Sequence, residues 1–162
     1  MQQVFLGIGG NLGDVLATMK KVAMSISSLP EVEEVRFSQV YQTSPVSDLL
    51  QPDYLNCACS LLTCLPPLLL FEKLRNIEID CGKIHKPKNA ARTIDIDILL
   101  YGDEIMNDDE LTIPHPRWQE RLFVLIPLAE LIESIGSCVL QNQIQKLLAI
   151  SQDRVELVAE EI

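Results

Sequence analysis

The sequence predicts an α+β fold, a ferredoxin-like sandwich in which helices pack on a mostly antiparallel sheet and further helices are added at the C-terminal end. Two observations predict this class. Segments with strand and helix patterns follow one another in the order β-α-β-β-α-β, and helical segments come after them. The chain has 162 residues without an internal repeat or linker, so we expect one domain over residues 1–162.

The first strand and first helix have clear signals. QQVFLGIGG, at residues 2–10, is an apolar run that ends in glycines, which is typical of a strand followed by a turn. Asp14 is suited to cap a helix over residues 15–29, where apolar side chains recur at helical spacing. Pro30 then ends the helix.

Two strands and a second helix are expected next. VEEVRFSQVYQT, at residues 32–43, alternates moderately well and predicts a single strand. Residues 44–53 are rich in turn formers and predict a long loop, after which YLNCACSLLT at residues 54–63 predicts a third strand. Two prolines then favour the start of a helix that continues to Gly82.

The remaining elements are one strand and two helices. RTIDIDILLY, at residues 92–101, has the apolar content of a buried strand, and Gly102 marks the turn that closes it. An irregular stretch precedes a helix around LFVLIPLAELI, at residues 122–132. A weaker amphipathic pattern at residues 140–149 predicts the last helix.

Composition argues against several classes of partner. The net charge of −10 disfavours nucleic acid and anionic membranes. No secretory signal pattern is expected at the start, and the longest apolar runs are far short of a membrane span. The five cysteines are odd in number and lack a CxxC pair, which favours reduced thiols packed in a cytoplasmic protein over disulfides or zinc.

The predicted strand at residues 92–101 contains two carboxylates. Side chains alternate along a strand, so Asp95 and Asp97 share one face, with Cα atoms roughly 7 Å apart. Two carboxylates so placed repel each other, and a divalent cation removes the conflict. Mg²⁺ prefers one or two carboxylates together with phosphates and water. The alternative is a pair of aspartates on the solvated face of a sheet.

A basic segment lies directly before these aspartates. GKIHKPKNAART, from Gly82 to Thr93, contains four cationic residues and no acid, although the protein as a whole is acidic. The alternative interpretation is an ordinary solvated loop. Because a polyphosphate needs both Mg²⁺ and cationic side chains, the combination favours a metal–phosphate site.

Other segments suggest further parts of a site. His115 lies between two prolines and, with Arg117 and Arg121, forms a possible second cationic arm; a structural histidine is the alternative. YQTSP, DYLN and Phe123 suit a pocket for a flat heterocycle, although they equally suit core and turn positions. GIGGNLGD lacks the residues of the Walker A and Rossmann fingerprints and predicts a tight turn.

Several of these segments together resemble one family. GGNLGD, YQTSP, QPDYLN, RTIDIDILLYG and PHPRWQERLFVLIPLAEL occur over roughly residues 3–133 in the order of the 6-hydroxymethyl-7,8-dihydropterin pyrophosphokinase family of folate biosynthesis. The resemblance implies a ferredoxin-like fold and a monomeric enzyme. It also implies that the pterin hydroxymethyl oxygen attacks the β-phosphorus of ATP, with two Mg²⁺ ions bound and AMP leaving.

The resemblance assigns roles by motif position. It implies that both Mg²⁺ ions are held by Asp95 and Asp97. The implied catalytic residues are Arg92, Asp95, Asp97, Lys83 and Arg121. The implied ATP-binding residues are Glu78, Lys83, Arg92, His115 and Arg121. The implied pterin-binding residues are Thr43, Ser44, Val46, Tyr54, Asn56, Asp95 and Phe123.

The chain also departs from the family pattern. Lys83 stands where many members carry arginine, and Asn-Ala-Ala at residues 89–91 replaces Trp-Gly-Pro, which removes a bidentate donor and a stacking surface. Gly10 stands where serine is usual, which we interpret as a minor change in the first turn. Two alternatives remain: another Mg²⁺-dependent nucleotide transferase, and a catalytically silent binding module. The intact charged residues argue against silence.

Overall fold

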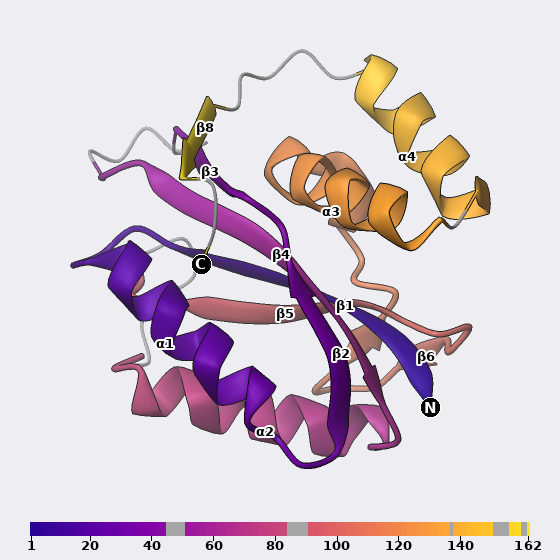
Figure 1. The fold of residues 1–162 in the computed structure, drawn as a ribbon, viewed down its shortest axis with the longest axis horizontal. Helices are drawn as coiled ribbons and strands as arrows, with labels where there is room; N and C mark the ends of the chain where they lie inside the picture. The colour runs from indigo at the N-terminus through magenta and orange to yellow at the C-terminus, as the bar shows by residue number, and fades with distance from the viewer. Residues whose placement is uncertain (45–50, 84–90, 137, 151–155, 160–161) are drawn as a thin grey trace.

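A computed structural model describes residues 1–44, 51–83, 91–136, 138–150, 156–159 and 162. Within these residues six strands form one antiparallel sheet, in the order β5-β1-β4-β3-β8, and β2 also pairs with β4 (Figure 1). The strands are β1 (Gln2–Gly10), β2 (Val32–Phe37), β3 (Val40–Thr43), β4 (Tyr54–Thr63), β5 (Asp95–Tyr101) and β8 (Glu156–Ala159). The predicted fold class is confirmed.

Helices cover both faces of this sheet. The two helices of the β-α-β-β-α-β unit, α1 (Val15–Ser27) and α2 (Pro67–Asp80), bury their apolar stripes on one face (Figure 1). The C-terminal helices α3 (Leu122–Ile135) and α4 (Cys138–Ile150) lie on the opposite face, where Phe5 and Leu99 meet them. The sequence predicts these helices, but not the face that they cover.

Local signals explain most helix boundaries. The Asp14 carboxylate caps α1 by accepting a hydrogen bond from the backbone N–H of Ala17 at 3.0 Å. Pro67 is the first residue of α2, where its missing N–H costs no helical hydrogen bond. Gly136 ends α3 in the left-handed conformation, with φ of 78°.

The prediction of one strand over residues 32–43 is wrong. The ladder breaks between β2 and β3, where the Ser38 hydroxyl accepts a hydrogen bond from the backbone N–H of Ala58 at 2.8 Å. The sequence analysis also missed β8 and a small hairpin of β6 (Met106–Asn107) and β7 (Thr112–Ile113). Short strands have few alternating positions, so whether they form depends on pairing with another strand.

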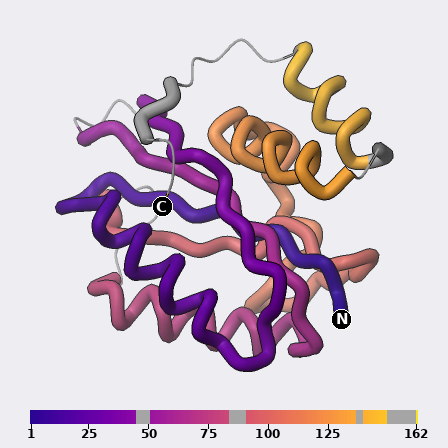
Figure 2. Tube along the Cα trace, in the orientation of Figure 1, coloured from indigo at the N-terminus to yellow at the C-terminus, as the bar shows by residue number. Residues whose placement is uncertain are grey.

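The C-terminal end of the chain returns to the sheet. β8 pairs with the edge strand β3, and Ile162 packs against the core between the sheet and α1 and α2. Figure 2 shows α3 and α4 on the other side of the sheet from α1 and α2. No described helix combines the length and apolar content needed to span a membrane. Cys57 and Cys59 are buried in that core as predicted, and burial raises the pKa of the Cys57 thiol to about 12.

Candidate functional site

Three neighbouring strands bring distant residues into one row. β1 lies between β4 and β5, and Gly9 pairs with both Asn56 and Asp95. Directly paired residues point to the same face, so Asn56 and Asp95 flank a position without a side chain, about 10 Å apart across two strand spacings. In the next such row Gly7 lies between Ala58 and Asp97. The apolar partners Ile96 and Ile98 face the opposite core, as the alternation predicts.

Asp95 lies at the centre of a charged cluster. Lys83 Nζ is 2.8 Å from its Oδ1 atom, and the Arg92 guanidinium donates to its Oδ2 atom. Lys83 also contacts the Glu78 carboxylate, with Nζ 2.7 Å from Oε2. Four of the predicted charged residues are therefore joined by ion pairs in the described structure.

Glu78 is the buried member of this cluster. Its residue surface is 4% exposed, and its Oε1 atom accepts a hydrogen bond from the Ile96 backbone N–H at 2.6 Å. Burial raises the pKa of Glu78, and the hydrogen bonds from Lys83 and Ile96 oppose this shift. The side chain that the resemblance places near the nucleotide thus also joins the end of α2 to β5.

Asp97 is the more open carboxylate of the pair. Its side chain is exposed, and no ion pair to it occurs among the described residues. Neighbouring protein atoms still desolvate it in part, which raises its pKa, as does Asp95. The neighbouring His115 and Arg121 side chains lower the pKa of Asp97. Asp97 is therefore accessible to a cation from solvent, with further positive groups nearby.

His115 is held in a defined orientation. Its backbone N–H donates to the Leu99 carbonyl at 2.9 Å, and its Nδ1 atom accepts from the Arg117 backbone N–H at 3.1 Å. With Nδ1 an acceptor, a neutral ring carries its proton on Nε2, which leaves Nε2 as the donor for a ligand. Arg117 itself pairs with Glu120 at 3.0 Å on the surface, next to the 3₁₀ helix η1 (Trp118–Glu120).

Arg121 and Phe123 stand at the start of α3. The Arg121 guanidinium lies 5.5 Å from the centroid of the Phe123 ring, within range of a cation–π interaction. Both side chains are partly buried. The ring thus restrains a cation whose charge acts on Asp97.

The predicted pterin-binding residues are only partly described. Asn56 is 6% exposed, and its Nδ2 atom donates to the Thr43 hydroxyl at 2.9 Å. The Tyr54 hydroxyl contacts Oε1 of Gln51 at 3.4 Å, and Ser44 is exposed. Val46 lies outside the described residues, as does the part of the basic segment at residues 84–90.

Sequence reasoning missed the role of Asn11. This residue is 3% exposed; its backbone N–H donates to the Arg92 carbonyl, and its Oδ1 atom accepts from the Arg92 N–H, both at 2.9 Å. Its Nδ2 atom donates to Gln51 and to the Pro52 carbonyl, at 3.3 and 3.1 Å. Asn11 therefore joins the segment before Asp95 to the one before Tyr54. Its place directly after the glycines was the only available signal.

Gly10 is more constrained than the sequence suggested. A Cβ atom there would lie 2.3 Å from the Thr93 carbonyl oxygen, a backbone atom of the segment that contains Arg92. We expect Gly10→Ala to displace this segment, lower the free energy of unfolding by about 1–3 kcal/mol, and weaken the ATP binding that the sequence predicts. Urea unfolding and equilibrium nucleotide binding measure the two effects.

Gly7→Ala is the matched control on the same strand. Its Cβ would meet the flexible Leu99 side chain at 3.3 Å, so a small shift of Leu99 accommodates it. If the two variants had equal stability and equal ATP affinity, the close contact between Gly10 and the Thr93 carbonyl would not be important for folding or binding.

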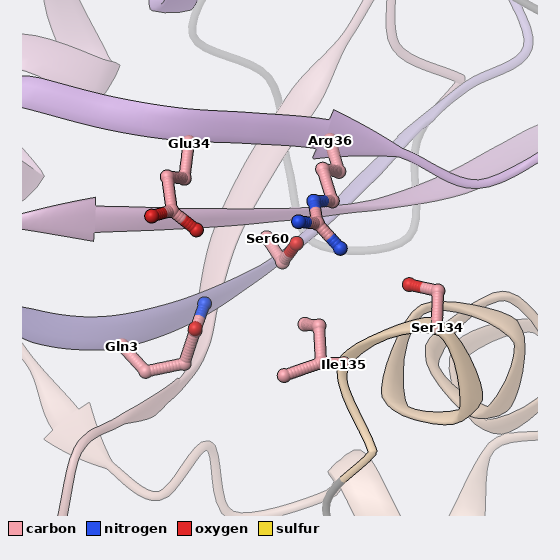
Figure 3. A pocket seen from close by; sticks show the side chains of 6 residues that line it. All are labelled: Gln3, Glu34, Arg36, Ser60, Ser134 and Ile135. Atoms are coloured by element: carbon pink, nitrogen blue, oxygen red, sulfur yellow. The ribbon is translucent and has the colours of Figure 1, made fainter.

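A separate cavity lies at the other end of α3. It measures about 200 Å³, and Figure 3 shows its lining by Gln3, Glu34, Arg36, Ser60, Ser134 and Ile135. None of the predicted site residues lines it. The Ser60 hydroxyl is buried there without a hydrogen-bond partner in the described structure. The candidate site is an open sheet surface rather than this cavity.

The donor set suits a metal that shares its ligands with a substrate. The described residues contain no group of three or more histidine, cysteine or acidic side chains able to hold a metal ion. If Asp95 and Asp97 held a metal ion, they would provide two carboxylates, and phosphate oxygens and water would have to complete the coordination. This is the arrangement that Mg²⁺ prefers over cages made of protein ligands alone.

Comparison with solved structures defines the class of fold. A crystal structure of Plasmodium falciparum HPPK-DHPS superposes with a TM-score of 0.60 at 16% identity, covering 92% of this chain and 43% of that chain. Another, of HPPK-DHPS in complex with substrates, gives a TM-score of 0.59 at 16% identity and covers 81% and 40% of the two chains. This chain spans less than half of either protein. Its fold is the ferredoxin-like sandwich of HPPK domains.

Sequence comparison defines the family. Residues 5–133 match the family described as 7,8-dihydro-6-hydroxymethylpterin-pyrophosphokinase (HPPK). The 2-amino-4-hydroxy-6-hydroxymethyldihydropteridine pyrophosphokinase of Haemophilus influenzae is 35% identical over 135 residues, 83% of this chain and 84% of the relative. That of Bacillus subtilis is 34% identical over 131 residues, 81% and 78% of the two chains. The chain belongs to this family of diphosphotransferases, which acts in folate biosynthesis.

Proposed function

We propose that this enzyme transfers pyrophosphate from ATP to the hydroxymethyl group of 6-hydroxymethyl-7,8-dihydropterin in a Mg²⁺-dependent reaction, giving the pterin diphosphate and AMP. The row of Asn56, Gly9 and Asp95 supports this most directly. The absence of a side chain at Gly9 lets the Asn56 amide lie close over β1, where it could read the polar edge of a flat ring, and the Asp95 carboxylate in the same row could lie next to the ring's hydroxyl.

The charged residues suit the other substrate. Phosphoryl-type transfer depends on in-line positioning and on neutralisation of charge more than on covalent chemistry. We assign Lys83, Arg92 and Arg121 to the triphosphate, with the Nε2 proton of His115 as a further donor. Asp95 and Asp97 would hold two Mg²⁺ ions, which supply Lewis acidity and a template for the phosphates when bound. Asp95 would also help to accept or orient the hydroxyl proton.

The pocket residues complete the assignment. Thr43 holds the Asn56 amide by a hydrogen bond, which fixes the direction in which Asn56 meets a ring. Tyr54 and Phe123 supply faces for stacking, and Ser44 and Val46 belong to the same pocket by motif position. We further propose that the enzyme works as a cytoplasmic monomer on small-molecule substrates, without nucleic acid or membrane.

The decisive experiment follows the nucleotide product. With Mg²⁺, ATP and the hydroxymethyl-dihydropterin, we expect AMP and pterin diphosphate to appear in equal amounts, because attack at the β-phosphorus releases AMP. Chromatography of the quenched reaction measures both, and EDTA should abolish both. Release of ADP would show cleavage of a different bond and would refute the proposal, as would AMP formation that does not depend on the pterin.

A further inference from the structure

Cationic side chains occupy both oxygens of the Asp95 carboxylate. Lys83 Nζ is 2.8 Å from Oδ1, and the Arg92 guanidinium contacts Oδ2. A divalent cation is attracted to the same oxygens and is repelled by both positive charges. Metal binding at Asp95 therefore competes with these ion pairs.

Lys83 has a second carboxylate partner. Its Nζ atom is 2.7 Å from Oε2 of Glu78, whose side chain is 6% exposed. The other Glu78 oxygen is fixed by the N–H of Ile96, the residue that follows Asp95 in β5. Lys83 thus bridges a buried carboxylate that is anchored to β5 and a more open one at the site.

We propose that Lys83 is a resident counter-ion of Asp95 that an incoming divalent cation displaces, and that Glu78 keeps the displaced Lys83 beside the site. The inference rests on the proposed function for its nucleotide part only. Glu78 is then a positioning residue that acts through Lys83. Two consequences follow. Metal alone binds weakly, and a triphosphate that arrives with the metal offers the displaced ammonium a new partner, so metal and nucleotide bind cooperatively.

Mn²⁺ binding without nucleotide tests the displacement. Electron paramagnetic resonance of free Mn²⁺ gives the affinity directly. We expect Lys83→Met to bind Mn²⁺ about tenfold more tightly than the wild type, equivalent to about 1.4 kcal/mol, because the competing charge is gone. Lys83→Gln is a second variant that keeps a hydrogen-bond donor toward both carboxylates, and circular dichroism confirms that each variant is folded.

A matched control separates local competition from net charge. Lys20→Met removes one exposed positive charge from α1, on the opposite face of the sheet. Its Mn²⁺ affinity should stay within about twofold of the wild type, since solvent and salt screen distant charges. Asp97→Asn identifies the site, because it should abolish the binding in both the wild type and Lys83→Met.

The role of Glu78 is tested by a double-mutant cycle. With Glu78→Gln, Lys83 retains Asp95 as its remaining carboxylate partner in the cluster, so Mn²⁺ should bind more weakly. The weakening should be at least about threefold greater in the wild-type background than in Lys83→Met, since coupled residues are not additive. Equal weakening in both backgrounds would remove Glu78 from the proposal.

An unreactive ATP analogue should reverse the direction in which Lys83→Met changes the Mn²⁺ affinity. In its presence we expect Lys83→Met to bind Mn²⁺ about tenfold more weakly than the wild type, equivalent to about 1.4 kcal/mol, because a partner of the triphosphate is lost. An unchanged or lower Mn²⁺ affinity of Lys83→Met without nucleotide overturns the displacement, as does an equal gain in Lys20→Met. Lack of any Asp97-dependent Mn²⁺ binding overturns both proposals. If Lys83→Met gains tenfold in Mn²⁺ affinity but neither the wild type nor any variant binds the ATP analogue, the displacement stands and the proposed function alone is overturned.

Discussion

Replacement of Asp97 by alanine is expected to abolish pyrophosphoryl transfer, with a loss in kcat/KM of at least about a thousandfold. Asp97 is the carboxylate without an ion pair among the described residues, so it is the one most open to a metal. Because the side chain is exposed, the free energy of unfolding should change by no more than about 0.5 kcal/mol. AMP formation and urea unfolding measure the two quantities.

A second aspartate provides the control. Asp103 is exposed in the turn that follows β5, so Asp103→Ala removes the same charge close by in sequence. Its activity should equal that of the wild type. If Asp97→Ala retained normal turnover, the metal site would have to be abandoned, because Asp95 alone is already neutralised by two cations.

Loss of the Asn56 amide should weaken the use of the pterin substrate and leave ATP binding unchanged. We expect Asn56→Ala to lower kcat/KM for the pterin about a hundredfold or more, since a site built to hydrogen-bond a ring discriminates strongly when those bonds are lost. The KM for ATP should stay within about twofold, because the residues that we propose to bind ATP are untouched. Steady-state kinetics with each substrate varied in turn separates the two effects.

Gly9 offers an independent way to disturb the same amide. A Cβ at Gly9 would lie 2.6 Å from Oδ1 of Asn56, so Gly9→Ala should displace the amide and raise the KM for the pterin. Ser60→Ala is the control on the strand and face of Asn56, since the Ser60 hydroxyl has no partner to lose in the described structure. A Gly9→Ala enzyme with normal pterin kinetics would show that the position of the Asn56 amide does not matter for pterin binding.

Some elements followed from local signals. The alternation of β5 and the cap at Asp14 depend on a few neighbouring residues, and both occur as predicted. The prediction of a continuous strand over residues 32–43 was wrong because the Ser38 side chain replaces a backbone ladder contact. That contact is to the partner strand β4, which is distant in the sequence. The same limit applies to β8, whose pairing with β3 joins segments more than one hundred residues apart.

The charged cluster shows which features of the site the sequence predicts and which depend on tertiary structure. Lys83, Arg92 and Asp95 were each identified from a basic segment next to paired acids, but the sequence contained no sign that Lys83 bridges two carboxylates. Glu78 was placed near a nucleotide by motif position, and its hydrogen bond to the Ile96 N–H became visible only when α2 and β5 were packed together. Asn11 was not singled out, because its partners lie in two other loops.

The sequence by itself determined which side chains face the site, because strand alternation places Asp95 and Asp97 opposite three buried isoleucines. Tertiary structure alone decided what those side chains meet. Burial of the apolar faces sets the order of β4, β1 and β5 and their register, and that register puts Asn56, Gly9 and Asp95 in one row. Long-range pairing has no local signature, since its energy comes from surfaces that only the folded chain brings together.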